Sequence, residues 1–220
     1  SKNLKNIAIF YQNDDFGEEG YISSLEIIKK QNLNLVSIGS YKRNTLSIEH
    51  AFNEIKQSKP EAIIMIGAHK ANSFFIQKAK NDELLKDTIF CNISFSDANS
   101  IVNELKASNT STQNIIFSQV VPNYDDKNLK IVQEYQEIMK KYSPNSKLGF
   151  ISFEGFLASK VLVDAIRRSE ENLIKSEFLQ ALKNTPNNLL YEINIEYNQK
   201  KLLNQTYLFE YVDDSFKEIK

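Results

Sequence analysis

The 220-residue sequence contains one cysteine, two histidines and nearly balanced charge. One cysteine cannot form a disulfide within the chain. Cys91 lies in the apolar run 89–93, which favours a small buried side chain over a reactive thiol. The cysteine count does not decide whether the protein belongs to an oxidising or a reducing compartment, because many extracytoplasmic proteins also lack disulfides. A net charge of -1 without a basic face removes the attraction that nucleic-acid binding requires, so we expect no nucleic-acid partner.

The sequence also lacks the motifs of metal, nucleotide and catalytic sites. Neither His50 nor His69 lies in a metal-binding pattern such as H-x-x-x-H. No serine lies in G-x-S-x-G, and there is no G-x-G-x-x-G or P-loop motif. We therefore predict no catalytic residues, no metal and no cofactor. No apolar run approaches the roughly 20 residues of a membrane span.

Apolar runs alternate with helical patterns over the first half of the chain. The predicted order is strand 7–12, helix 16–31, strand 33–38, helix 45–58, strand 61–66, helix 70–81, strand 88–93, helix 97–107 and strand 114–121. Strands that alternate with helices form a parallel sheet covered on both faces. The predicted fold class is therefore α/β, with an open parallel sheet in a lobe that spans residues 1–121.

The pattern changes where this last strand meets a proline. Val121, Pro122 and Asn123 begin a polar stretch that ends at Asp126, and we predict a hinge at residues 122–126 together with Val121. Beyond it the pattern predicts helices at 127–142, 152–169 and 175–184, then an antiparallel hairpin from the alternating runs 191–197 and 207–211.

Helix 152–169 is apolar around most of its circumference, which an exposed helix could not sustain. The second half supplies no parallel strands to cover it, so the missing strands lie upstream or come from a partner. If the chain folds alone, this helix predicts a homodimer.

Four stretches together resemble the type I periplasmic binding proteins, in the branch that binds leucine and other branched-chain amino acids. They are residues 7–17 (IAIFYQNDDFG), 60–67 (PEAIIMIG), 120–122 (VVP) and 152–166. Members of this family trap a ligand between two hinged lobes. The resemblance implies that residues 1–121 are lobe two and that residues 127–220 are the returning helices and the C-terminal hairpin of an incomplete lobe one. It also implies that the natural protein extends upstream of Ser1.

The same resemblance implies a function. We expect a non-enzymatic, periplasmic solute-binding protein that delivers a small molecule to the permease of an ABC importer. The alternative is the ligand-sensing domain of a membrane receptor such as a histidine kinase or cyclase, which a membrane span after Lys220 would favour. A third, weaker hypothesis is an enzyme on a doubly wound sheet, which turnover lost on replacing His69 would support.

Ligands of open parallel sheets bind just outside the carboxyl ends of the strands. This position and the resemblance together predict six ligand-binding residues after the first, third and fourth strands: Asp14, Phe16, Ala68, His69, Ser94 and Phe95. Branched-chain amino acid binders commonly carry an acidic residue after the fourth strand, where this chain has Ser94. A ligand with an aromatic or apolar body and a carboxylate or carbonyl therefore fits at least as well as a free amino acid.

Asp14 and Asp15 imitate the acidic pair of phosphoacceptor receiver domains. That interpretation requires an aspartate after the third strand, where the sequence has Gly67 and Ala68. We therefore assign the pair to solvation and to favourable charge at a helix N-terminus. Gly17 is predicted to let the turn tighten, so that the helix begins close to the sheet.

Overall fold

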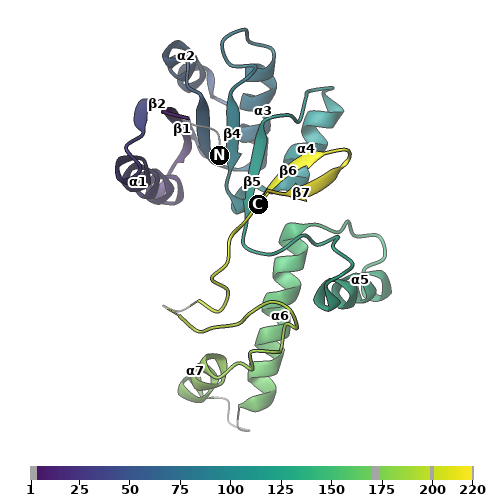
Figure 1. The fold of residues 1–220 in the computed structure, drawn as a ribbon. Coiled ribbons are helices and arrows are strands. Elements are labelled where there is room, and N and C mark those ends of the chain that lie inside the picture. The colour runs from purple at the N-terminus through teal and green to yellow at the C-terminus, as the bar shows by residue number, and fades with distance from the viewer. Residues whose placement is uncertain (1–3, 170–173, 199–200, 220) are drawn as a thin grey trace. The chain divides into compact units, whose positions relative to one another are not determined.

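The computed structural model describes residues 4–169, 174–198 and 201–219. The chain divides into two compact units: unit 1 contains Ser1–Gln119 and Leu208–Lys220, and unit 2 contains Val120–Tyr207. The elements are β1 (Asn6–Asn13), α1 (Asp15–Lys30), β2 (Asn34–Lys42), α2 (Glu49–Ser58), β3 (Ala62–Ile66), α3 (His69–Lys80), β4 (Ile89–Asn92), η1 (Ser94–Ser96), α4 (Ala98–Ala107), β5 (Ile115–Gln119), α5 (Lys130–Tyr142), α6 (Phe150–Arg168), α7 (Lys175–Lys183), β6 (Tyr207–Val212) and β7 (Ser215–Glu218) (Figure 1).

Unit 1 is built on a seven-stranded sheet in the order β2-β1-β3-β4-β5-β6-β7. The pairs that join β1 to β2 and to β3, β3 to β4, and β4 to β5 are all parallel. This confirms the α/β prediction. Side chains alternate between the two faces of each strand, so Ile7 and Ile9 join a core cluster with Ile28 of α1. Phe10 points to the other face, where its ring lies 4.6 Å from that of Phe75 in α3.

The start of α1 shows why a glycine stands there. Asp14 caps the helix by accepting a hydrogen bond from the Gly17 N–H at 3.1 Å. A Cβ on Gly17 would lie 1.7 Å from the carbonyl oxygen of Gln12. Only glycine allows the helix to begin this close to the end of β1, as the sequence predicts.

The second helix begins later than predicted, at Glu49 instead of residue 45. Asn44 takes a left-handed backbone conformation with φ of 59°. The Thr45 hydroxyl donates back to the carbonyl of Lys42 at 2.6 Å, which holds a turn at the end of β2. These local bonds compete with helix formation over residues 45–48.

The C-terminal hairpin differs from the prediction in both its strands and its location. β6 pairs antiparallel with β7 through the turn at Asp213 and Asp214, which have φ of 50° and 57°. Positive φ at both central residues is the geometry of a two-residue hairpin turn. Within residues 191–197 the structure has no strand. The predicted hairpin of 191–197 with 207–211 is therefore wrong.

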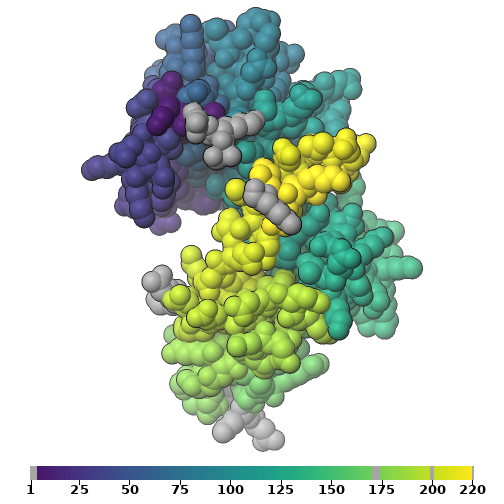
Figure 2. All heavy atoms as spheres, in the orientation of Figure 1, coloured from purple at the N-terminus to yellow at the C-terminus, as the bar shows by residue number. Residues whose placement is uncertain are grey.

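The hairpin also completes the sheet of unit 1, with β6 beside β5, and does not join the helices that precede it. Its atoms, yellow in Figure 2, lie against the teal atoms of the α4 region. There Lys106 of α4 donates to the Tyr211 hydroxyl at 3.0 Å. The prediction that residues 127–220 all belong to one lobe is therefore corrected: residues 208–220 belong to unit 1. Two chain crossings, 119–120 and 207–208, separate the units, and the sequence pattern revealed only the first.

The described part of unit 2 contains helices α5, α6 and α7 joined by irregular segments, and it has an aromatic core. The Tyr135 ring of α5 lies 5.0 Å from that of Phe153 in α6, and Tyr124 contacts Phe150 edge to face. Lys160 of α6 forms an ion pair with Glu134 of α5 at 2.6 Å. Helix α6 buries one stripe but exposes apolar residues elsewhere, namely Ile151, Leu162, Val163 and Ile166. Across the described residues, no helix is both long and apolar enough to span a membrane.

Candidate functional site at the carboxyl edge of the sheet

The strand order places a topological switch point between β1 and β3. The chain leaves β1 to form β2 on one side, then returns to form β3 on the other. The connections after β1 and β3 therefore diverge, and ligands of open α/β sheets bind in the crevice that results. The six predicted ligand-binding residues all follow strands at this carboxyl edge.

Phe16 and Phe95 are brought together from the loops after β1 and β4. Their ring centroids lie 4.6 Å apart in a tilted arrangement. Phe16 packs partly against the core cluster beneath α1, whereas Phe95 is 60% exposed. Exposing most of a phenylalanine forgoes its hydrophobic stabilisation. The pair thus presents a fixed apolar surface that a ligand could cover, and Ser94 precedes it in the same turn.

The Asp14 carboxylate is engaged by the protein itself. Besides capping α1, it accepts a hydrogen bond from Gln12 Nε2 at 2.6 Å. The Arg43 guanidinium lies 3.7 Å away. These contacts assign Asp14 a structural role at the end of β1, and its contact with a ligand stays a prediction.

Tyr41 joins three strand ends, and sequence reasoning did not find it. Its buried hydroxyl donates to Gln12 Oε1 at 3.1 Å and accepts from the Ala68 N–H at 3.0 Å. Burial raises the pKa of Tyr41 above its usual value, the Ala68 bond opposes this, and the nearby Asp14 charge adds to it. The hydroxyl therefore stays protonated and able to donate. The only signal in the sequence is a tyrosine at the end of the strand 34–42.

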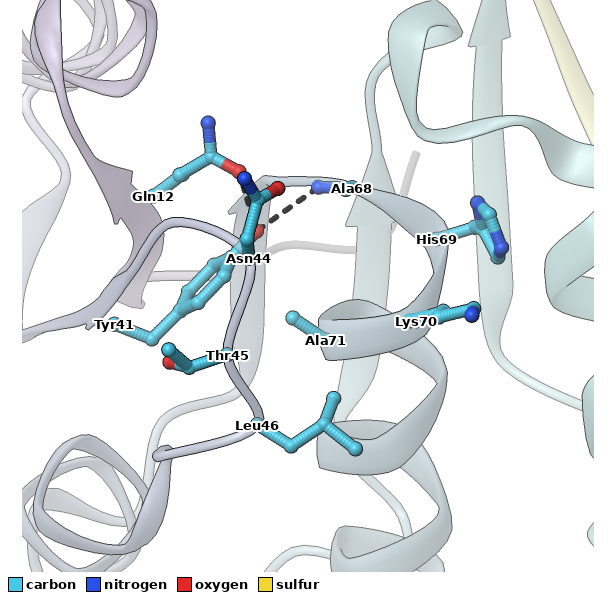
Figure 3. A pocket seen from close by; sticks show the side chains of 9 residues that line it. All are labelled: Gln12, Tyr41, Asn44, Thr45, Leu46, Ala68, His69, Lys70 and Ala71. Carbon is cyan, nitrogen blue, oxygen red and sulfur yellow. Dashed lines mark hydrogen bonds between the residues drawn. The ribbon is translucent and has the colours of Figure 1, made fainter.

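A cavity of about 400 Å³ opens beside this tyrosine (Figure 3). It is lined by Gln12, Tyr41, Asn44, Thr45, Leu46, Ala68, His69, Lys70 and Ala71. Two predicted residues, Ala68 and His69, are among them, whereas the other four, Asp14, Phe16, Ser94 and Phe95, are not. Figure 3 shows Ala71 directed toward the Tyr41 side of the cavity, with His69 and Lys70 pointing away from Tyr41. The structure thus places Ala68 and His69 at this cavity, Phe16 and Phe95 in an aromatic pair with Ser94 beside it, and Asp14 at the cap of α1.

The first turn of α3 borders the cavity and favours negative charge. Helix α3 begins at His69 with no side-chain cap, and its first turn carries no acidic residue. The first N–H groups of a helix lack intrahelical acceptors, and the helix dipole is positive at this end. His69 Nε2 lies 3.6 Å from Glu104 Oε1 of α4. A carboxylate or carbonyl could accept hydrogen bonds at this helix end.

Metal and thiol chemistry find no support at this edge. Among residues 4–169, 174–198 and 201–219, no group of three or more His, Cys, Asp or Glu side chains could hold a metal ion. Burial raises the pKa of the Cys91 thiol to about 11. The thiol is therefore protonated near neutral pH and a poor nucleophile.

The chain matches the family model described as "Periplasmic binding protein" over residues 1–215, and it belongs to this family. By sequence, no curated protein matches the chain. A solved structure of a possible leucine/isoleucine/valine-binding protein from Rhodopirellula baltica is 26% identical and has a TM-score of 0.86. That comparison covers 100% of this chain and 60% of the other.

Two further solved structures share the fold at lower identity. The fatty acid ABC transporter substrate-binding protein of Thermomonospora curvata is 13% identical, with a TM-score of 0.82 over 100% of this chain and 57% of its own. The solute-binding protein of an R. palustris ABC transporter, solved with benzoate, is 13% identical, with a TM-score of 0.77 over 98% of this chain and 58% of its own. The chain thus spans about 60% of the length of the first of these structures.

Proposed function

We propose that this chain is the ligand-binding part of an extracytoplasmic solute-binding protein that delivers a small molecule to an ABC importer. The observation that carries the proposal is the contact between half-buried Phe16 and exposed Phe95 at the carboxyl edge of an open parallel sheet. The family supports solute binding, and the similar solved structures include binding proteins of ABC transporters. Such proteins capture and release their ligand without transforming it.

The ligand we propose has an apolar or aromatic body and a carboxylate or carbonyl group. The aromatic rings would cover the body, since ring pairs bury large apolar areas. The first turn of α3, near Ala68 and His69, would accept the negative or polar end. Solved proteins of this fold carry the names of branched-chain amino acid, fatty acid and benzoate binders, and each of these ligands has both parts.

Ligand capture would involve closure about the connection that begins at Val121. Val121 and Pro122 are buried and Asn123 is half-buried, while a second connection runs through 207–208. Two short connections restrict the motion to a hinge, with backbone rotation absorbed by few residues. A ligand that contacts both units in the closed state would shift the population toward it.

The test is a thermal-melt panel on the full-length protein with amino acids, aromatic and aliphatic carboxylates, and short peptides. A ligand that binds only the folded state stabilises it by mass action and so raises the melting temperature. At a ligand concentration one hundred times Kd, the free energy of unfolding rises by about 2.7 kcal/mol. We expect a saturable rise with one chemical class. A cooperative melt that no compound shifts would contradict capture of a small solute.

Pairing of α6 with a second copy stays a prediction. Its exposed apolar residues, Ile151, Leu162, Val163 and Ile166, are the surface concerned. The prediction applies to the 220-residue chain folding alone, so sedimentation of that chain at several concentrations tests it. A mass of two chains that falls to one on replacing Leu162 and Ile166 by lysine would support pairing, and a monomer at all concentrations would contradict it.

A further inference from the structure

We infer that Asn72 is a positioning residue for the ligand site: it holds the Ser94–Ser96 turn, and with it the exposed Phe95 ring, in register with the loop after β3. This inference rests on the proposed function, because it explains how the Phe16 and Phe95 pair is kept in place. Asn72 does not line the cavity and no sequence pattern singled it out. Its role follows from what its buried amide contacts.

The Asn72 side chain connects three segments that are distant in the sequence. The residue is fully buried in α3, and its Nδ2 group donates to Asn92 Oδ1 at 3.0 Å and to Ser96 Oγ at 3.1 Å. The Gly67 carbonyl lies 3.4 Å from the same nitrogen. One amide group thus joins the loop after β3, the end of β4 and the turn that follows it.

Ser96 closes the connection back to β3. Its hydroxyl donates to the Gly67 carbonyl at 2.8 Å while it accepts from Asn72. Ser96 has no exposed surface, whereas its neighbour Phe95 is 60% exposed. Fixing the buried residue therefore fixes where the chain presents the exposed ring. The Phe95 ring then meets Phe16 of the β1 loop at 4.6 Å.

Gly67 provides the space that this arrangement requires. A Cβ at Gly67 would lie 2.7 Å from Asn72 Oδ1 and 2.7 Å from the Tyr41 hydroxyl. The Tyr41 and Asn72 side chains thus approach the same backbone position from two sides. The Asn72 amide N–H groups and the Ser96 hydroxyl are hydrogen-bonded here, whereas Asn72 Oδ1 and Asn92 Nδ2 have no partner among the described residues. Buried polar groups cost free energy when they are unpaired, but the bonds that are made favour one geometry. Such a network is suited to holding loops in a single arrangement.

The chain offers a matched control on the same helix. Ser73 is also fully buried, and its hydroxyl donates to the carbonyl of His69 at 2.7 Å, within α3. The Ser73→Ala variant removes a buried hydroxyl without disconnecting the turn. Ser96→Ala removes the turn's own hydroxyl and leaves α3 intact, so it tests the connection even if Asn72→Ala folds poorly.

The first measurement needs no ligand: amide hydrogen exchange of the full-length protein. Ser96 N–H donates to the Ile93 carbonyl and Asp97 N–H to the Ser94 carbonyl, so both amides report on the turn. We expect exchange at these two amides to accelerate about tenfold in Asn72→Ala, which loses three hydrogen bonds, and about threefold in Ser96→Ala, which loses two. Amides of β1, and all amides of Ser73→Ala, should keep their rates. Unchanged rates at Ser96 and Asp97, or one equal increase across unit 1, would overturn the inference.

The second measurement is a double-mutant cycle with benzoate and leucine as probes. If Asn72 acts through Phe95, Asn72→Ala weakens binding about tenfold, and the double variant with Phe95→Ala binds no more weakly than Phe95→Ala alone. Additive losses would mean that Asn72 acts elsewhere and would overturn the inference. If the unmodified protein binds neither probe, that choice of ligand fails, while hydrogen exchange still decides whether Asn72 holds the turn.

Discussion

Unit 1 and unit 2 differ in the kinds of side chain that they bury. Unit 1 buries a set of polar side chains near the carboxyl ends of its strands: Gln12, Asn72, Asn92, Ser96 and Gln119. Within the described part of unit 2, Thr185 is the single buried polar residue, and the interior is dominated by aromatic and aliphatic packing. Burying polar groups costs free energy unless every bond is made, so their concentration at one edge indicates a surface built for more than stability.

The largest contrast concerns two glycines. Gly17→Ala would place a Cβ 1.7 Å from the Gln12 carbonyl oxygen, so α1 or β1 must move. We expect a loss of about 3 kcal/mol or more in the free energy of unfolding, at the upper end for overpacking. Gly155 of α6 has nothing within 4 Å of its Cβ position. Gly155→Ala should therefore stabilise unit 2 by up to about 1 kcal/mol through helix propensity.

Urea denaturation of both variants measures this contrast. The two changes are chemically identical, so their difference isolates the close approach at the start of α1. Equal effects on the two units would contradict the assignment of Gly17 to that approach.

The second comparison concerns two buried tyrosines, one in each unit. Tyr41 of unit 1 and Tyr135 of unit 2 each have a hydroxyl with two partners; Tyr135 contacts Ser152 Oγ at 2.6 Å and the Gly149 N–H at 3.3 Å. Replacing either by phenylalanine removes both of its hydroxyl's hydrogen bonds and should cost about 1–3 kcal/mol of stability. We expect only Tyr41→Phe to weaken ligand binding as well, because it frees Ala68 at the cavity.

Denaturation and ligand titration of both variants separate the two effects. Unaltered binding in Tyr41→Phe would show that this hydroxyl matters only for folding, and equally weakened binding in Tyr135→Phe would show that lost stability alone weakens binding.

The smallest effect is a pH dependence at the opposite edge of the sheet. Hydrogen bonds from the backbone N–H groups of Asn6 and then Lys5 hold the pKa of Glu61 below its ordinary 4.5. A lowered pKa means that this carboxylate stabilises the folded chain at pH above its unfolded pKa, and that the contribution disappears as pH falls through the folded pKa. Glu61→Gln should therefore lower the melting temperature slightly at pH 7. On acidification to about pH 3, the melting temperature of the variant should fall less than that of the native protein. A variant whose melting curve follows the native one at both pH values would contradict this.

The first five strands were predictable, because each carries an apolar run and a helical pattern separates it from the next. The location of the hairpin was not predictable: the alternation of Tyr191 to Tyr197 resembles a strand, but within the part of the chain that the structure describes no strand pairs with it. The signal that decides is the pair Asp213 and Asp214, which forms the tight turn. Which sheet accepts a hairpin depends on contacts between residues about a hundred positions apart, such as Lys106 with Tyr211.

The position of the candidate residues at one edge of the sheet was predictable, and their contact with a ligand stays a prediction. Phe16, Ala68, His69, Ser94 and Phe95 follow strands, and strand ends meet at one edge of a parallel sheet. Tyr41 and Asn72 were missed because their roles depend on side-chain hydrogen bonds between distant segments. A buried asparagine in a helix has no local pattern that distinguishes it from an exposed one.

The central claim is that the Phe16 and Phe95 pair covers the apolar body of a ligand. The most direct test is calorimetric titration of the full-length protein with the ligand that shifts its melt, comparing native protein with Phe95→Ala. Phe74→Ala is the control, since Phe74 is also partly exposed in unit 1 but lines a groove with Lys56 and Asp82. We predict that Phe95→Ala raises Kd about tenfold or more, as expected for an aromatic contact residue, and that Phe74→Ala leaves it unchanged. Equal affinity in native protein and Phe95→Ala would contradict the account.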